Sequence, residues 1–332
     1  MMKNYIAIIV FTLLVAFKGN SQDRISGFNF AIDEDFFVKL IGLNNQDRNY
    51  TLGFHLSFFN SNWNSYLANL MKIKSNKEDL LPSEISLDAV AFSPNIISKP
   101  EIQHGDRPYA NVLFLSLKRH GLNKNIYNSK TLYVGLMGTR IAEFFQSTIH
   151  RWVNSPDPKG WNNQISDGGE ITLMYTRKKL KLMIDNQSFQ LNHGYTYNLG
   201  YLVNAGYNLG LRWGKIDRSQ WIDDMSGFIG STSAKKSNRF HKENHKEYYA
   251  YANLNSNVNL YNASLHGQFR SSNYIVPYSK TGFVTFEVTL GAAFSLGNLM
   301  VSTYYKFRSP EIWDSNYKYI HDWMGLSVSS NF

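Results

Sequence analysis

The stretch Tyr50-Thr51-Leu52-Gly53-Phe54-His55-Leu56-Ser57-Phe58 alternates large apolar side chains with small or polar ones. Successive side chains of a β-strand point to opposite faces. One face of this stretch is therefore apolar, and the other carries Thr51, His55 and Ser57. The pattern predicts a strand with one face toward an apolar environment and the other toward water.

The same two-residue period recurs along the chain, in runs separated by polar stretches rich in Asn and Lys. Together with 50–58, about twelve strands are predicted from it. The other runs are 27–38, 108–119, 131–140, 169–178, 180–193, 198–213, 246–256, 258–266, 282–294, 297–308 and 320–332. The two runs within 246–266 also fit one long strand.

A soluble β-sandwich and a transmembrane barrel both produce this alternation. The last strand favours the barrel: Met324, Leu326 and Val328 share a phase, and Phe332 closes the sequence. That arrangement resembles the C-terminal signature of bacterial outer-membrane barrels. Tyr and Trp near the strand ends and long polar loops agree with it. We therefore expect an all-β, antiparallel transmembrane barrel of about twelve strands.

Composition narrows the chemistry and the partners. The chain has no cysteine, which excludes disulfides, thiolate metal sites and cysteine nucleophiles. Its mean hydropathy is −0.34, but a barrel places its apolar residues at alternate positions and dilutes them with polar loops. The net charge of +9 fits attraction to an anionic glycolipid. No nucleic-acid recognition motif accompanies this charge, so we expect no nucleic-acid partner.

The N-terminus predicts an export signal. Lys3 precedes the apolar run from Ile6 to Phe17, and small residues end at Ser21. A membrane anchor is the alternative, but the apolar run is shorter than the roughly 20 residues that a spanning helix requires. We expect residues 1–21 to be a signal peptide and 22–332 to be one barrel domain in the bacterial outer membrane.

One segment lacks the alternation. Ile141–Val153 ends before Pro156 and predicts a short helix. Gln146 and His150 are four residues apart and therefore lie on one helical face. Such a pair beside a barrel wall could position a water molecule. Alternatively, the helix only packs its apolar side chains on the barrel and leaves His150 in solvent; the spacing alone leaves both interpretations open.

Further motifs occur around this helix and upstream of it. They are Asp33-Glu34-Asp35-Phe36-Phe37, Asp47-Arg48-Asn49-Tyr50-Thr51-Leu52-Gly53, Gly105-Asp106-Arg107-Pro108-Tyr109-Ala110, Gln146-Ser147-Thr148-Ile149-His150 and Pro156-Asp157-Pro158-Lys159-Gly160-Trp161-Asn162-Asn163-Gln164. In this order and combination they resemble the outer-membrane lipid A 3′-O-deacylase family. The resemblance extends over most of the chain and is densest between about residues 28 and 170.

The resemblance implies a twelve-stranded barrel whose active site lies near the extracellular mouth, between the wall and a short helix. It also implies hydrolysis of the ester that holds the 3′-linked acyloxyacyl group of lipid A, with Ca²⁺ as cofactor. By motif position, the implied roles are His150 as general base, Gln146 as its companion, Thr51 as an active-site hydroxyl, Asp35 as the calcium-associated carboxylate and Lys99 as the substrate-binding lysine.

These residue types suit the reaction. A neutral imidazole accepts a proton from water near neutral pH, and calcium prefers carboxylate and carbonyl oxygens. A calcium ion beside the ester carbonyl would polarise it. The expected mechanism is attack by a water molecule that His150 activates, without a serine or cysteine nucleophile.

Two positions depart from the family pattern. Glu34 stands where the family favours asparagine, and Leu52 replaces an expected asparagine after Thr51. An ionised glutamate cannot donate a hydrogen bond, so Glu34 either joins the calcium ligands or weakens stabilisation of the oxyanion. We include Glu34 among the catalytic candidates.

Other functions stay open at this point. His55 and Ser57 share a strand face, which fits either an outer-membrane phospholipase or an ordinary pair in the barrel lumen. A non-catalytic channel or binding barrel would also show the same strand pattern. The basic run 235–242 is either a solvated loop or a contact for lipopolysaccharide phosphates. We expect lipopolysaccharide and outer-membrane lipids as partners, and a monomer.

Overall fold

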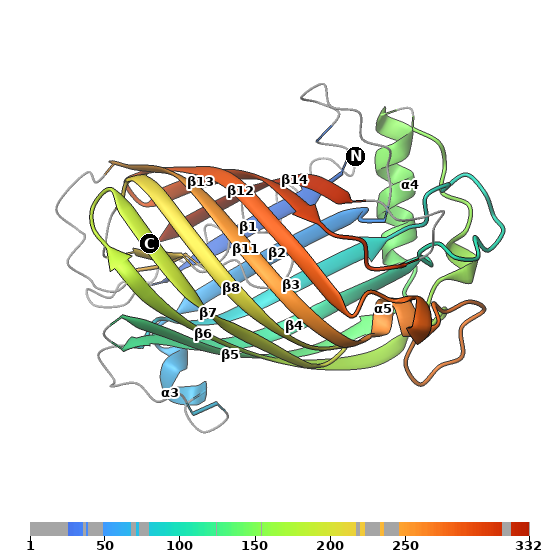
Figure 1. Ribbon diagram of the computed structural model, residues 1–332, viewed down its shortest axis with the longest axis horizontal. Helices are drawn as coiled ribbons and strands as arrows, with labels where there is room; N and C mark the ends of the chain where they lie inside the picture. Colours follow the sequence, from blue (N-terminus) through green and yellow to red (C-terminus); the bar gives the residue numbers. More distant parts are fainter. Residues whose placement is uncertain are drawn as a thin grey trace.

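Twelve strands close into an antiparallel barrel in the computed structural model (Figure 1). Their order around the barrel is β1-β14-β13-β12-β11-β8-β7-β6-β5-β4-β3-β2. The structure describes residues 26–35, 38, 49–67, 71–72, 80–123, 125–153, 155–216, 220–222, 233–235, 246–313 and 320–331. The predicted signal peptide, residues 1–21, and nearly all of the basic run 235–242 lie outside these ranges.

The barrel strands are β1 (Ser26–Glu34), β2 (Leu52–Asn60), β3 (Ser83–Phe92), β4 (Ala110–Asn123), β5 (Ile126–Met137), β6 (Glu170–Asp185), β7 (Phe189–Gly200), β8 (Leu202–Lys215), β11 (Lys246–Asn262), β12 (Val284–Leu296), β13 (Leu299–Arg308) and β14 (His321–Asn331). Strands β9 (Gln220–Ile222) and β10 (Ser233–Lys235) form a separate two-stranded sheet. The helices are α3 (Trp63–Leu67), α4 (Ile141–Val153) and α5 (Ala263–His266), with the 3₁₀ helices η2 (Trp161–Asn163) and η4 (Tyr278–Lys280). Within the described ranges, no helix combines the length and apolarity that a membrane crossing requires.

The predicted alternation sets the two faces of the wall. In β2, burial alternates residue by residue, so that His55 and Ser57 are buried in the lumen while Phe54 and Leu56 lie on the outside. Outward-facing residues on the other strands are large and apolar, and many are more than half exposed, among them Leu115, Val134, Ile171, Leu199 and Phe286. An apolar outer band around a polar interior is the arrangement of a membrane-spanning barrel.

The predicted count of twelve strands is confirmed. The runs 246–256 and 258–266 form the single strand β11, which is the alternative that the sequence left open, and residues 263–266 form helix α5. Ser256 interrupts the outward apolar series of β11 between Leu254 and Val258. The sequence prediction also missed β3. Its inward face carries Glu84 and Asp88, whose ion-pair partners His55 and Lys118 lie on the neighbouring strands β2 and β4.

The two ends of the barrel differ. Helices α4 and α5 lie at one end, and α3 lies at the other (Figure 1). At the α3 end, three strand pairs are joined by very short turns, at 124–125, 186–188 and 297–298. Short turns face the periplasm in outer-membrane barrels and longer loops face outward. The α4 end is therefore the extracellular end, and the connection that contains the run 235–242 joins β8 to β11 at the opposite end.

The lumen is filled near the extracellular end. Tyr50, Phe92, Phe114, Tyr201 and Trp323 belong to one buried cluster there. The Tyr50 and Trp323 rings stack with centroids 4.2 Å apart, and Phe114 packs edge-on against Tyr201 at 5.4 Å. These aromatic side chains close the inner face of the wall behind the segments that carry the candidate site.

Candidate active site

Helix α4 packs against the outside of the barrel wall. Its Ala142 shares a buried cluster with Ala91 of β3, Tyr109 and Trp161, and Leu52 of β2 packs against that cluster. Leu52 and Ala91 alternate with residues whose side chains face the lumen, so the contact lies on the outer surface of β2 to β4. The predicted helix 141–153 is confirmed to the residue. We refer to the region between α4 and this outer surface as the cleft.

His150 lies on the last turn of α4 with only 4% of its surface exposed. Its Nδ1 is 2.6 Å from the main-chain oxygen of Pro156. A carbonyl oxygen only accepts hydrogen bonds, so Nδ1 carries the proton, and in the neutral ring the lone pair is on Nε2. This contact fixes both the tautomer and the orientation of the ring, as a general base requires.

Gln146 lies one turn before His150 and is also buried. Its Oε1 accepts a hydrogen bond of 2.8 Å from Trp161 Nε1. Its amide nitrogen Nε2 is buried and has no hydrogen-bond partner in the described part of the chain. An unsatisfied buried donor is costly in a folded protein. Nε2 is therefore a donor that can serve a bound ligand.

The segment after α4 is held by hydrogen bonds and ring contacts with the 93–109 loop. Lys159 N and Tyr109 OH both donate to Ile97 O, over 2.9 and 3.0 Å, and the Trp161 and Tyr109 rings lie 4.6 Å apart. A Cβ on Gly160 would come within 2.5 Å of the Tyr109 ring. The Gly-Trp pair of the sequence motif thus allows close packing and sets the position of Trp161, which in turn orients Gln146.

Thr51 and the acidic pair lie at the extracellular ends of β1 and β2. The Thr51 Oγ1 and Ser93 Oγ atoms are 2.8 Å apart, and both residues are buried. Strands β1 and β2 pair Asp33 with Gly53. Continued along the strands, this register brings Asp35 to the level of Thr51. Sequence reasoning missed Ser93, which no motif includes.

The donor chemistry of this group fits a hard cation. Glu34 and Asp35 are adjacent and buried, and hydroxyl oxygens from Thr51 and Ser93 are paired nearby. Calcium takes six to eight oxygen ligands, including main-chain carbonyls and water. Within the described residues, no three His, Asp or Glu side chains form a group able to hold a metal. Carbonyls, water or substrate oxygens would therefore complete the coordination.

Lys99 is exposed on the 93–109 loop. Its main-chain nitrogen donates to Ile96 O over 3.3 Å, and its carbonyl oxygen lies against Gly160. Lys99 therefore lies beside the segment that follows α4. Of the predicted residues, Gln146 and His150 lie together on α4, whereas Asp35 and Thr51 lie at the extracellular ends of β1 and β2. Trp161 donates a hydrogen bond to Gln146 and packs in the cluster that Leu52, the residue after Thr51, also contacts.

The Asp-Arg-Pro-Tyr-Ala motif closes the mouth of the barrel. Arg107 is 1% exposed; its Nη1 lies 2.5 Å from Glu311 Oε2, and its Nη2 donates to Ser264 Oγ over 2.7 Å. Burial alone would raise the pKa of Glu311, but the guanidiniums of Arg107 and Arg308 outweigh it and lower the pKa to about 2. Arg107 therefore ties three extracellular loops together.

His55 and Ser57 face the lumen and make structural contacts. His55 Nδ1 lies 2.6 Å from Asp88 Oδ1, and its Nε2 lies 3.5 Å from Glu84 Oε1. Ser57 Oγ accepts a hydrogen bond from Asn29 Nδ2. Both residues are at most 2% exposed, and no lipid on the outer surface reaches them. The lumen-facing interpretation holds, and the phospholipase interpretation loses its basis.

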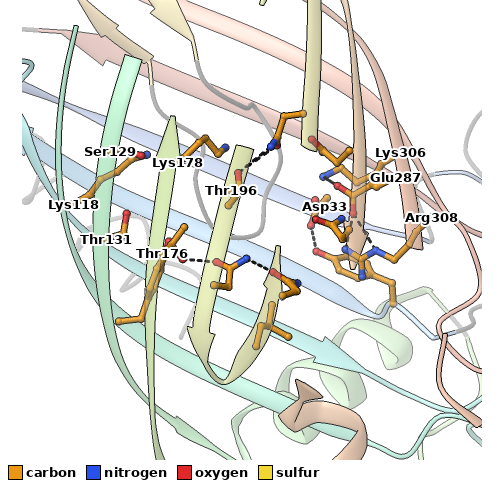
Figure 2. Close-up of a pocket in the computed structure, with 18 of the residues that line it drawn as sticks. Asp33, Lys118, Ser129, Thr131, Thr176, Lys178, Thr196, Glu287, Lys306 and Arg308 are labelled. Atoms are coloured by element: carbon orange, nitrogen blue, oxygen red, sulfur yellow. Dashed lines mark hydrogen bonds and ion pairs between the residues drawn. The ribbon is translucent and has the colours of Figure 1, made fainter. Parts of the chain in front are cut away.

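A polar cavity of about 180 Å³ occupies part of the lumen (Figure 2). Lys306 and Arg308 converge there on Glu287, with Lys306 Nζ 3.0 Å and Arg308 Nη2 2.7 Å from its carboxylate oxygens. Nearby, Asp33 accepts hydrogen bonds from Tyr50 OH, Tyr304 OH and Trp323 Nε1. These charges are paired or hydrogen-bonded within the wall, as in a structural interior.

A closed barrel with an apolar outer band, aromatic packing in the lumen near the extracellular end and a helix packed on its outer surface defines a β-barrel of the outer-membrane class. The comparisons with known proteins agree. The chain belongs to the family of outer membrane protein LpxR, whose family model matches residues 6–332. The resemblance seen in the motifs is thus confirmed, and the protein resides in the outer membrane.

A solved structure shows the same fold. LpxR from Salmonella typhimurium aligns with a TM-score of 0.67 at 17% identity, covering 92% of this chain and 100% of its own. The β domain of the Bordetella autotransporter BrkA gives a TM-score of 0.40 at 8% identity, over 93% and 99% of the two chains. A search of curated protein sequences finds no match.

Proposed function

We propose that this protein is a calcium-dependent lipid A 3′-O-deacylase, a carboxylic ester hydrolase that removes the 3′-linked acyloxyacyl group. The observation that carries the proposal is the buried His150, whose Nδ1 is held by Pro156 O in a cleft on the outer side of the wall. Membership of the LpxR family supports it. Lipid A lies in the outer leaflet, at the level of this extracellular cleft.

The chain's own residues account for the proton movements. Water gives a proton to His150 Nε2 while its oxygen attacks the ester carbonyl carbon. When the tetrahedral intermediate collapses, the bond from that carbon to the 3-oxygen of the sugar breaks, and the histidine returns the proton to the departing oxygen. The products are the free acyloxyacyl acid and a sugar hydroxyl. A positioned base of this kind contributes about 10²–10⁴-fold to the rate.

Three further groups would act on the developing oxyanion and the substrate. The Gln146 amide, which has no partner among the described residues, would donate to the oxyanion, and the Thr51 hydroxyl, 2.8 Å from Ser93 Oγ, would be a second polar group at the substrate. Asp35 and Glu34 would hold the calcium ion, which when bound polarises the ester carbonyl. Lys99, beside the segment that follows α4, would pair with a phosphate of the glycolipid.

The side chains in the lumen argue against both alternative functions, a channel and a phospholipase. Its extracellular half is filled by aromatic side chains, which argues against an open channel. His55 and Ser57 are buried inside the wall and engaged with Asp88 and Asn29, which argues against a phospholipase built on them.

The test incubates purified protein with lipopolysaccharide or phosphatidylglycerol vesicles, with calcium or chelator, and weighs the lipid products by mass spectrometry. Loss of the 3′ acyloxyacyl mass only with calcium, abolished in His150→Ala and retained in Ser57→Ala, is the expected result. Fatty acid released only from phosphatidylglycerol and lost in Ser57→Ala would overturn the proposal. So would ion conductance in planar bilayers without any hydrolysis.

A further inference from the structure

On the side of the barrel formed by β6 to β8, the edge of the wall is uneven at the extracellular end, and we call this step the notch. Strand β6 pairs with β5 from Glu170 onward, but its pairing with β7 begins only at Met174, opposite Gly200. The β7–β8 connection turns tightly there, with Tyr201 N donating to Leu173 O over 2.8 Å. The first three residues of β6, 170–172, therefore extend beyond the β7–β8 turn and pair there only with β5.

A strap made of residues 267–270 crosses this notch. It follows α5, which continues from the end of β11. Phe269 N and Arg270 N both donate to Glu170 Oε1, over 2.6 and 3.1 Å, and Ser166 Oγ donates to Glu170 Oε2. One carboxylate on β6 thus holds the strap in place. Figure 1 shows α5 at the same end of the barrel as α4.

Beneath the strap lies a groove of about 900 Å³, within the range of ligand-binding pockets. Its lining includes Ile171, Leu173, Val203, Tyr261, Phe269 and Arg270. Phe269 is 90% exposed, Ile171 67% and Leu173 58%. The site lies on β6, β7, β8 and β11, whereas α4 packs on β2 to β4. It is separate from the cleft that holds His150.

The groove combines an apolar floor with one cation. Arg270 lies against Gly168, where a Cβ would come within 2.9 Å of Arg270 Nη2. In the part of the chain that the structure describes, the Arg270 guanidinium makes no ion pair, because Glu170 is occupied by main-chain N–H groups and Ser166. A planar guanidinium above apolar surface at the outer leaflet matches a phosphate attached to acyl chains.

We infer that this groove binds a second molecule of lipopolysaccharide, with an acyl chain along Ile171 and Leu173 beneath Phe269 and a phosphate on Arg270. The occupant follows from position and charge. The groove opens on the lipid-facing surface at the extracellular end, where the leaflet is made of an anionic glycolipid. The site does not perform chemistry; it anchors the barrel to the surrounding glycolipid independently of the cleft.

The first test measures retained lipid on full-length protein carrying His150→Ala, so that turnover does not consume the ligand. Native mass spectrometry follows titration with lipopolysaccharide and, separately, with phosphatidylglycerol. Adding Arg270→Ala should weaken retention of one lipopolysaccharide molecule roughly tenfold. Lys181 is an exposed lysine toward the other end of β6. The variant Lys181→Ala is the matched control and should leave the retention of lipopolysaccharide unchanged. Equal retention by Arg270→Ala and the control overturns the inference, as does retention of phosphatidylglycerol alone.

A second test needs no change at Arg270. A photoreactive phenylalanine analogue replaces Phe269, whose side chain is 90% exposed, and is irradiated in intact outer membranes. Crosslinks to lipopolysaccharide are expected; crosslinks to phospholipid only, or none, contradict the inference. Neither readout depends on ester hydrolysis, so failure of the proposed deacylase activity and failure of this site are distinguishable.

Discussion

The cleft beneath α4 and the barrel lumen each hold a buried histidine, but the two rings have different partners. His55 in the lumen has Asp88 2.6 Å from Nδ1 and Glu84 3.5 Å from Nε2. His150 in the cleft has a main-chain carbonyl 2.6 Å from Nδ1. The first ring serves as an ion-pair partner, and the second keeps its lone pair on Nε2. The groups that contact each ring, rather than the residue type, therefore distinguish the structural His55 from the candidate base His150.

Each of the two regions also holds a buried glutamine. Substitution of the one on α4 should have the largest effect on the rate. Gln146→Ala removes the donor that faces the oxyanion and should lower kcat by about 10²–10³. Gln190→Ala removes a lumen glutamine that bonds Asp185 and Arg212 and should leave kcat of the folded protein unchanged. Steady-state rates on lipopolysaccharide check both; a comparable drop in kcat for the two variants would remove the distinction.

Breaking the ion pair at the mouth should affect stability and spare the chemistry. Arg107→Met leaves Glu311 buried beside Arg308 alone and should lower the free energy of unfolding by about 3 kcal/mol. The double variant Arg107→Met with Glu311→Gln should recover part of this loss, because no carboxylate is left unpaired. Urea unfolding in detergent measures both. An unchanged midpoint together with lost activity would instead make Arg107 part of the site.

Substitution of Glu34, which departs from the family pattern, should have a smaller effect on activity. If its buried carboxylate belongs to the calcium ligands, Glu34→Asn should raise the calcium concentration for half-maximal activity roughly tenfold, because ligand charge tunes affinity. The amide would restore the residue that the family favours. Faster hydrolysis at an unchanged calcium requirement would show that Glu34 weakens oxyanion stabilisation.

The smallest effect concerns pH. The arginines Arg107 and Arg308 lower the pKa of Glu311 from 4.5 to about 2, so its contribution to stability is complete above pH 4.5 and is lost as the pH falls toward 2. The difference in unfolding free energy between the unaltered protein and Glu311→Gln should shrink over this window. A difference that stays constant from pH 6 to pH 2 would contradict the assignment.

The sequence predicts the wall better than its charged interior. Alternation identifies strands such as β2 directly, and the lack of alternation locates α4 to the residue. Ser256 interrupts the outward apolar series of β11 and hides its continuity, and the inward carboxylates of β3 are stabilised by His55 and Lys118 on the neighbouring strands. Local periodicity carries no information on those long-range contacts.

The candidate site also has residues that the sequence predicts and residues that it does not. Helical spacing places Gln146 and His150 on one face, and the motifs point to Asp35 and Thr51. Ser93, which bonds Thr51, could not be predicted, because it lies in the loop after β3, 42 positions from Thr51. The motif containing Arg107 stands out in the sequence, yet its partner Glu311 is 204 positions distant. Only the closed barrel reveals that this motif has a structural role.

The central claim is that the chemistry belongs to the cleft and not to the lumen. The most direct test compares His150→Ala with His55→Gln, at equal amounts of folded protein, by the mass of lipid A recovered from lipopolysaccharide in the presence of calcium. We predict that His55→Gln removes the 3′ acyloxyacyl group at the rate of the unaltered protein per folded molecule and that His150→Ala leaves lipid A intact. Hydrolysis by His150→Ala at the unaltered rate, or its loss in His55→Gln alone, would contradict the account.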